Sequence, residues 1–176
     1  MELKRIDRES PDINALERIN EEAIPEAERV SLEDMICTGA EVTGIYENGE
    51  PAGFLVTRDY RRICYLAFLA VRSDLRSRGL GGQAVRALIR LHPERQTVVE
   101  YEAPAEDCAS DVTRARRKGF YRRNGFYETG WYTFYDRTEF EVGCSDPEFD
   151  AEGFRAFADY LETTVSDHIP RLYRKG

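Results

Sequence analysis

The stretch LAVRSDLRSRGLGG, residues 69–82, decides the fold because it joins two apolar segments of different periodicity. The segment around its start, ICYLAFLAV (63–71), is typical of a central strand that is buried on both faces. Beyond it, apolar residues recur at helical spacing from Leu80 to Leu91, and Pro93 ends the pattern. We therefore predict a strand that runs through a glycine-rich turn directly into a helix.

This turn has the composition of an anion-binding site. The first N–H groups of a helix lack partners within the helix, and the helix dipole adds partial positive charge there. Glycine allows phosphate oxygens to approach the backbone, and Arg76 and Arg78 supply charge for further hydrogen bonds. The pattern is neither the P-loop, which needs a lysine, nor the dinucleotide motif GxGxxG. The alternative is a turn that only permits tight packing of the helix on the strand.

Residues before the turn predict strands and two short helices. LKRI (3–6) is a short strand, a helix begins near Ile13 after Pro11, and Ser31 with Asp34 resembles a capping box. Asn48-Gly49 is a strong hairpin signal that joins strands near 42–46 and 52–58.

Residues after the helix predicted from Leu80 to Leu91 also form strands and helices in turn. TVVEYE (97–102) is strand-like, and Ser110 is placed to cap a helix that contains Val112 and Phe120. Two aromatic-rich strands (127–136 and 138–143) precede a last helix that Asp150 caps. The order β-α-α-β-β-β-α-β-α-β-β-α predicts one α/β domain around a single sheet, spanning residues 1–176.

The composition of the chain argues against a membrane-spanning, secreted or metal-binding protein. The chain has 176 residues, and no apolar run approaches the roughly 20 residues that a membrane-spanning helix needs. The N-terminus has no apolar signal core, so we expect a soluble cytoplasmic protein. Four scattered cysteines and two histidines do not form a metal-binding pattern, and we expect reduced thiols and no metal.

Charge is distributed unevenly along the chain. The net charge is −8, and the first sixty residues carry 15 acidic and 6 basic side chains, which leaves the remainder close to neutral. Such a chain is a poor nucleic-acid binder. The acidic part either attracts a cationic partner or is a solvated surface.

Two motifs resemble the GNAT superfamily of N-acyltransferases. Residues 69–82 resemble its acetyl-CoA signature, whose core [R/Q]-x-x-G-x-[G/A] corresponds to Arg76–Gly81, and FYRRNGF (120–126) resembles its late-helix signature. The spacing of the motifs and the element order are also similar. The resemblance covers about residues 1–143, with 144–176 as a helical extension. It implies a mixed α+β fold with a mostly antiparallel sheet of six to seven strands, helices on both faces, and a fourth strand splayed from the fifth.

The resemblance also implies acetyl-CoA as co-substrate. The pantetheine arm would pair with backbone groups of Leu69, Ala70 and Val71. The pyrophosphate would bind the turn amides of Arg76, Ser77, Arg78, Gly79, Leu80, Gly81 and Gly82. Arg114 stands where the family often has an asparagine that contacts CoA, which is a departure from the pattern. We expect Arg114 to bind the cofactor by reaching a phosphate instead.

Catalytic roles follow from the same resemblance. Tyr121 would be the general acid for the leaving thiolate, and a backbone N–H of strand four, that of Val71, would stabilise the oxyanion. Glu100 and Glu102 lie two apart on one strand and so share a face. We favour Glu100 over Glu102 as the general base; a salt bridge or solvent exposure is the alternative for both.

The implied function is transfer of an acetyl group from acetyl-CoA to a primary amine of a small molecule or peptide. Acidic first helices and the aromatic residues of 131–135 suit a cationic amine acceptor. We expect no nucleic-acid or membrane partner, and a homodimer is possible through the last helix. A non-catalytic acyl-CoA-binding module and a pure interaction protein remain as alternatives.

Overall fold

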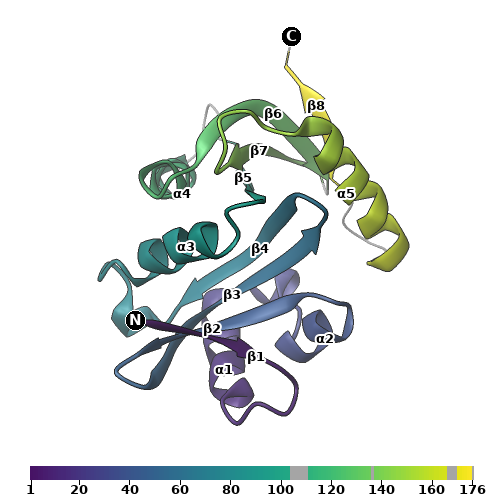
Figure 1. Ribbon diagram of the computed structural model, residues 1–176. Helices are drawn as coiled ribbons and strands as arrows, with labels where there is room; N and C mark the ends of the chain where they lie inside the picture. Colours follow the sequence, from purple (N-terminus) through teal and green to yellow (C-terminus); the bar gives the residue numbers. More distant parts are fainter. Residues whose placement is uncertain (104–110, 136, 166–169, 176) are drawn as a thin grey trace. The chain divides into compact units, whose positions relative to one another are not determined.

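The computed structural model describes residues 1–103, 111–135, 137–165 and 170–175 and forms a mixed α+β fold (Figure 1). Its elements are β1 (Glu2–Ile6), α1 (Ile13–Ala23), η1 (Glu26–Glu28), α2 (Leu32–Cys37), β2 (Glu41–Glu47), β3 (Glu50–Tyr60), β4 (Ile63–Val71), η2 (Ser73–Leu75), α3 (Leu80–Leu91), β5 (Gln96–Glu102), α4 (Asp111–Arg123), β6 (Tyr127–Tyr135), β7 (Thr138–Cys144), α5 (Ala151–Thr164) and β8 (Arg171–Arg174).

The strands follow the order β1-β2-β3-β4-β5-β7-β6-β8, and β4 and β5 pair in parallel. The pairs β1–β2, β2–β3, β5–β7, β6–β7 and β6–β8 are antiparallel. The predicted fold class is confirmed, although eight strands replace the expected six to seven. The additional strand is β8, whose four residues are too few to show an alternating pattern.

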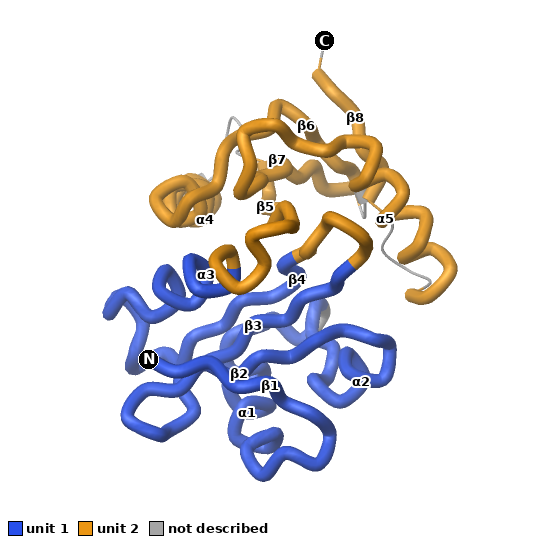
Figure 2. The backbone as a smooth tube through the Cα atoms, viewed as in Figure 1, with its two compact units in different colours: residues 1–59, 66–88 blue, residues 60–65, 89–176 orange. Residues whose placement is uncertain are grey.

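The chain divides into two compact units (Figure 2). Unit 1 comprises residues 1–59 and 66–88, which include β1, β2, α1, α2 and most of β3, β4 and α3. Unit 2 comprises residues 60–65 and 89–176, with β5 to β8, α4, α5 and the first three residues of β4.

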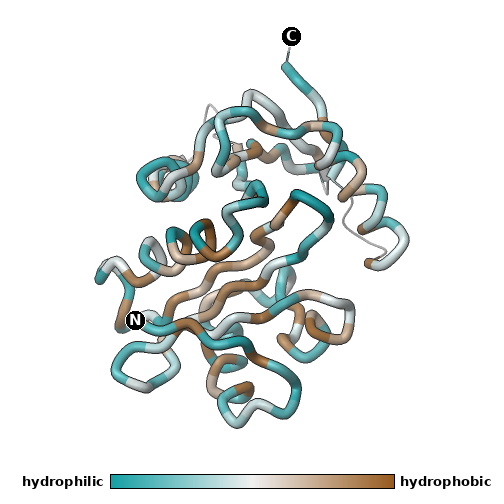
Figure 3. The backbone as a smooth tube through the Cα atoms, in the orientation of Figure 1, coloured by the Kyte–Doolittle hydropathy of each residue, from teal (hydrophilic) through white to brown (hydrophobic). Residues whose placement is uncertain are grey.

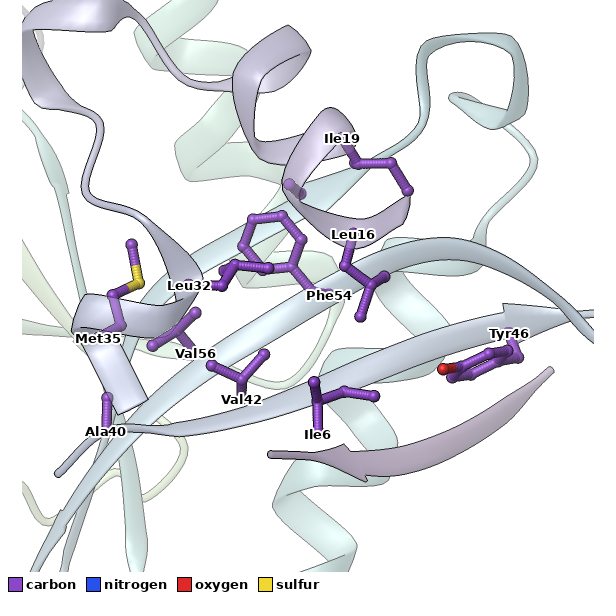
Figure 4. Packing of buried hydrophobic residues seen from close by; sticks show 11 residues of the cluster. Ile6, Leu16, Ile19, Leu32, Met35, Ala40, Val42, Tyr46, Phe54 and Val56 are labelled. Atoms are coloured by element: carbon purple, nitrogen blue, oxygen red, sulfur yellow. The ribbon is translucent and has the colours of Figure 1, made fainter. Parts of the chain in front are cut away.

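The core of unit 1 lies where α1 and α2 pack on one face of the strands (Figure 4). Leu16 of α1 and Leu32 of α2 are fully buried against Phe54 of β3. Truncating such a leucine to alanine typically costs 2–5 kcal/mol. The amphipathic spacing of the N-terminal sequence therefore fixes this layer.

Local signals in unit 1 act as predicted. Ser31 Oγ accepts a hydrogen bond from the Asp34 N–H (3.0 Å), and its hydroxyl donates to the Asp34 carboxylate (2.7 Å). Asn48 and Gly49 have φ values of 54° and 84°, as a type I′ hairpin turn requires. The Ser31 cap and the hairpin are thus confirmed, whereas the Asp34 carboxylate accepts from the Ser31 hydroxyl and not from the Ser31 N–H that a full capping box would use.

A β-bulge in β3 was not predicted. The β2–β3 register shifts so that Ile45 pairs with Gly53 and Tyr46 pairs with Pro51, which leaves Ala52 as the extra residue. The displaced Ala52 side chain is fully buried in a small cluster with Leu75 and Leu80.

The sheet of unit 2 is covered by α5 on one face and α4 on the other. Phe154 and Phe157 of α5 pack on Val98 and Val142, while Tyr121 of α4 stacks on Tyr101. Helix α4 is strongly hydrophilic along most of its length (Figure 3). Asp150 Oδ1 caps α5 by accepting from the Gly153 N–H (2.8 Å), as predicted, whereas Ser110 lies outside the described residues.

Candidate functional site

The turn between β4 and α3 is held at both ends by buried leucines. Leu75 and Leu80 are 7% and 3% exposed and pack with Ala52 and Val71. The four residues between these leucines, 76–79, are all exposed. The sequence therefore anchors the turn by its flanks and presents its backbone to solvent.

The turn backbone adopts two left-handed conformations. Ser77 has φ 64° and Gly79 has φ 84°; the first is unusual for a residue with a side chain. The first bond that closes α3 runs from the Gln83 N–H to the Gly79 carbonyl (3.0 Å). Within the described part of the chain, no acceptor binds the N–H groups of Leu80, Gly81 or Gly82. These donors and the helix dipole make the start of α3 suitable for an anion.

Both arginines of the turn have partners. The Arg76 Nε donates to the Val71 carbonyl (3.1 Å), and an Arg78 guanidinium nitrogen lies 3.4 Å from a carboxylate oxygen of Glu47. Both side chains stay exposed, so their charge remains close to the turn. Their present contacts brace the turn against the ends of β4 and β2.

The backbone N–H and C=O groups at the end of β4 point alternately toward β3 and toward the opposite edge of the strand. The Arg72 N–H donates to the Ala52 carbonyl (2.9 Å), so the groups of Arg72 and Ala70 point toward β3. A Cβ built on Gly53 would lie 2.3 Å from the Ala70 oxygen, which confirms this direction. Because backbone groups alternate along a strand, those of Leu69 and Val71 point to the opposite edge. Of the three predicted pantetheine partners, Ala70 faces β3, whereas Leu69 and Val71 face the opposite edge. The Val71 carbonyl there already accepts from Arg76, which leaves the Val71 N–H and the groups of Leu69 for a ligand.

The Tyr121 ring is fixed by a set of aromatic neighbours within unit 2. It stacks on Tyr101 (ring centroids 5.7 Å apart) and meets Phe120 and Phe126 edge-on at 5.1 and 5.3 Å. Burial raises the pKa of Tyr121 to about 12, against a smaller opposing effect of Arg117. The hydroxyl therefore stays protonated over the usual pH range and can donate a hydrogen bond.

Glu100 is held by two hydroxyl groups. The Tyr65 hydroxyl donates to Oε2 (2.6 Å), and the Thr133 hydroxyl donates to Oε1. Burial raises the pKa of Glu100, and the two hydrogen bonds oppose that rise. A carboxylate with a raised pKa is a stronger base. The sequence did not identify Tyr65 and Thr133, although both lie on the strands that flank β5 and β7.

Glu102 has a different environment from Glu100. The Arg114 Nε donates to its Oε2 at 2.6 Å. This ion pair is the alternative that the sequence left open for Glu102, and it also engages Arg114, the residue that departs from the resemblance. Neither side chain is fully exposed, with 31% and 24% of their side-chain surfaces accessible.

Comparison with protein families gives a direct match. The profile of the Acetyltransferase (GNAT) family matches residues 9–126, which include the turn, Glu100 and Tyr121. The chain belongs to the GNAT acetyltransferase family. This family consists of acyl-CoA-dependent transferases, and the two motifs quoted from the sequence both lie in the matched range. A search of curated protein sequences returns no significant match.

Solved structures support the GNAT fold. A Bacteroides thetaiotaomicron protein described as a GNAT acetyltransferase superposes with TM-score 0.73 and 23% identity, covering 94% of this chain and 98% of its own. The ribosomal-protein-S18-alanine N-acetyltransferase of Escherichia coli superposes with TM-score 0.60 and 21% sequence identity, and the match covers 81% of this chain and 92% of that protein. A GNAT acetyltransferase of Elizabethkingia anophelis with acetyl-CoA bound superposes with TM-score 0.57 and 14% sequence identity, and the match covers 81% of this chain and 95% of that protein.

Membrane-spanning helices and metal-binding clusters are both absent from the residues that the structure describes. No helix there combines the length and apolarity needed to cross a membrane. No group of three or more His, Cys, Asp or Glu side chains in the same residues is arranged to hold a metal ion.

Proposed function

We propose that this GNAT protein is an N-acetyltransferase that moves the acetyl group of acetyl-CoA to a primary amine. The observation that carries the proposal is the exposed turn before α3, with its left-handed backbone and unbound N–H groups. In the proposed complex these groups bind the pyrophosphate of CoA. Leu69 and the Val71 N–H offer backbone groups to the pantetheine arm along the edge of β4 that faces away from β3.

The proposed reaction is direct attack of a neutral amine on the thioester carbonyl. The new C–N bond forms as the Val71 N–H stabilises the oxyanion, and the C–S bond then breaks. Tyr121 donates a hydrogen bond to the departing thiolate. Glu100, or water, takes the proton that the amine loses. Glu100 alternates with Tyr101 along β5 and so lies on the face that α5 covers, whereas Tyr121 packs on Tyr101 at the opposite face; the proposed base and acid therefore act from opposite faces of this sheet.

The acceptor class is proposed to be a cationic amine, on a small molecule or a peptide. The acidic first sixty residues and the aromatic strand β6 support this choice. We propose a cytoplasmic location, which the buried reduced thiol of Cys144 supports.

A non-catalytic acyl-CoA-binding module is the second candidate. It is favoured by the contacts of both candidate bases, because Glu100 accepts two hydroxyl hydrogen bonds and Glu102 pairs with Arg114. Turnover separates the two candidates. Release of free thiol in the presence of acetyl-CoA and an amine panel supports the enzyme, and tight CoA binding without thiol release supports the module.

Calorimetric titration of acetyl-CoA tests the binding site directly. We expect micromolar binding to the wild type and at least tenfold weaker binding to Gly81→Glu, whose carboxylate would repel phosphate at the start of α3. A carboxylate in the first turn favours the helix, so the variant should fold. Gly81→Ala is the matched control and should retain most of the affinity. Equal affinity of Gly81→Glu and wild type would refute the location of the phosphate site.

A further inference from the structure

The C-terminal strand β8 brings a lysine onto the aromatic face of unit 2. Strand β8 pairs with β6, with Tyr173 opposite Tyr132 and Arg171 opposite Phe134. Lys175 follows directly after β8. Its position therefore depends on the pairing of the last strand with β6.

The Lys175 ammonium contacts both a ring and a carboxylate. Its Nζ lies 4.4 Å from the centroid of the Tyr132 ring and 2.6 Å from Glu139 Oε2. The Tyr173 hydroxyl donates to the other oxygen of the same carboxylate. A cation is thus held by the face of one aromatic ring and by a carboxylate that a second aromatic residue orients.

Neighbouring groups adapt this surface to a cation. Burial by itself would raise the pKa of Glu139, but hydrogen bonds from Lys175 and Tyr173 lower it below the ordinary value. The carboxylate is therefore ionised at neutral pH. Phe134 lies two residues from Tyr132 on the same face of β6 and is half exposed, so apolar surface continues beside the cation.

A second lysine in the chain makes similar contacts without forming a comparable site. Lys4 Nζ lies 4.4 Å from the Tyr46 ring centroid and 3.4 Å from Glu2. The Tyr46 residue is only 2% exposed, and Glu2 is 63% exposed at its side chain. Glu139 is 30% exposed, with a second hydroxyl partner. Lys4 thus only covers a buried ring, whereas Lys175 binds a carboxylate that Tyr173 already holds in place.

We propose that Tyr132, Glu139 and Tyr173 form a binding site for a primary alkylammonium ion, and that the chain's own Lys175 occupies this site in the absence of a ligand. The short contact to Glu139 requires an N–H donor, which favours a primary ammonium over a quaternary one. The adjacent Phe134 suits an aliphatic stem. The class of ligand is therefore a lysine side chain or an alkyl polyamine.

Lys175 would act as an internal competitor for such a ligand. A group tethered to the surface that it occupies has an effective concentration in the millimolar range or above. A small amine must displace it, and removing its ammonium should strengthen amine binding. This proposal concerns cation binding and does not depend on acyl transfer.

Binding of 1-aminopentane, followed by NMR of the tyrosine ring resonances, tests the proposal. We expect saturable shifts of Tyr132 in Lys175→Ala at millimolar amine, and about tenfold weaker binding to the wild type, since the tethered lysine competes there. Lys175→Arg keeps a cation at the site and should behave like the wild type. Adding Glu139→Gln to Lys175→Ala should abolish the saturable response, and adding Tyr132→Leu should abolish the response of the remaining Tyr173 ring.

Matched controls make the result decisive. Tetramethylammonium, which has no N–H, should not reproduce the shifts. Lys4→Ala removes the comparable lysine of unit 1 and should leave amine binding unchanged. Equal binding to wild type and Lys175→Ala would overturn the proposal, and so would an equal gain in Lys4→Ala. Loss of acetyl-CoA binding in a separate titration would affect only the proposed acyl transfer.

Discussion

The substitution Gly53→Ala tests how β3 fixes the end of β4. A Cβ at this position would lie 2.3 Å from the Ala70 carbonyl oxygen and 3.1 Å from the Val71 Cα. Carbon atoms in ordinary contact are about 3.5–4.0 Å apart, so the two strands must separate locally by about 1 Å. The obstructing atoms belong to the backbone and cannot rotate away.

Two effects should follow from this separation. Overpacking of this kind typically costs about 1–3 kcal/mol of folding free energy. The backbone groups of Leu69 and Val71 would also move, and losing one or two hydrogen bonds to CoA at about 1 kcal/mol each weakens binding roughly 5- to 30-fold. We expect calorimetry to show both the lower affinity and an unchanged stoichiometry.

Gly44→Ala separates the loss of stability from the loss of binding. Its Cβ would lie 2.8 Å from the Tyr46 ring and 3.2 Å from Ile6, so it also overpacks unit 1, but against side chains and away from β4. We expect comparable destabilisation and nearly normal affinity for acetyl-CoA. If Gly53→Ala binds as tightly as Gly44→Ala at a temperature where both are folded, the end of β4 does not hold the cofactor.

Three other substitutions have expected outcomes. Folding raises the pKa of Glu100, so ionisation of its side chain opposes folding. The free energy of unfolding of the wild type, measured against that of Glu100→Gln, should therefore fall as the pH rises above about 4.5 toward the raised pKa. Urea unfolding at several pH values measures this, and a constant difference would contradict it. Gly119→Ala should raise the free energy of unfolding by about 1 kcal/mol, because a Cβ there meets only the movable end of Arg123. Thermal unfolding checks this gain. Ser77→Gly relieves a left-handed conformation and should leave acetyl-CoA affinity unchanged; a large loss would show that the serine side chain binds the cofactor.

The sequence predicted those parts of the fold that local patterns determine. The apolar run of β4, the spacing of α3 and the Asn48-Gly49 turn depend on residues close together in the chain, and each was found at the expected position. Strand β8 was not predicted because its four residues become a strand only through pairing with β6. The bulge at Ala52 depends similarly on the β2–β3 register, which no local pattern specifies.

The sequence identified the candidate site residues, but it did not identify the residues that form hydrogen bonds with them. Spacing indicated that Glu100 and Glu102 share a face, and their partners on β7, Val142 and Phe140, agree with it. The contrast between the two carboxylates arises from distant residues. Thr133 reaches Glu100 from another strand, whereas Arg114 reaches Glu102 from α4. Such pairings depend on tertiary structure and leave no periodic signal.

The pKa of Tyr121 limits how this residue can assist the departing thiolate. A thiol has an ordinary pKa of about 8.5, and burial raises the pKa of Tyr121 to about 12. Complete proton transfer from this tyrosine to the thiolate is therefore uphill by about 5 kcal/mol in the free protein. A hydrogen bond that leaves the proton on oxygen avoids this step and still stabilises the developing charge. Replacing Tyr121 with a fluorinated tyrosine of lower pKa separates the two roles. Full proton transfer predicts a clear rise in the rate of thiol release, whereas hydrogen bonding predicts only a small change. Tyr121→Phe should slow release in both cases without altering acetyl-CoA affinity, and an equal loss of affinity would show that the ring has a structural role instead.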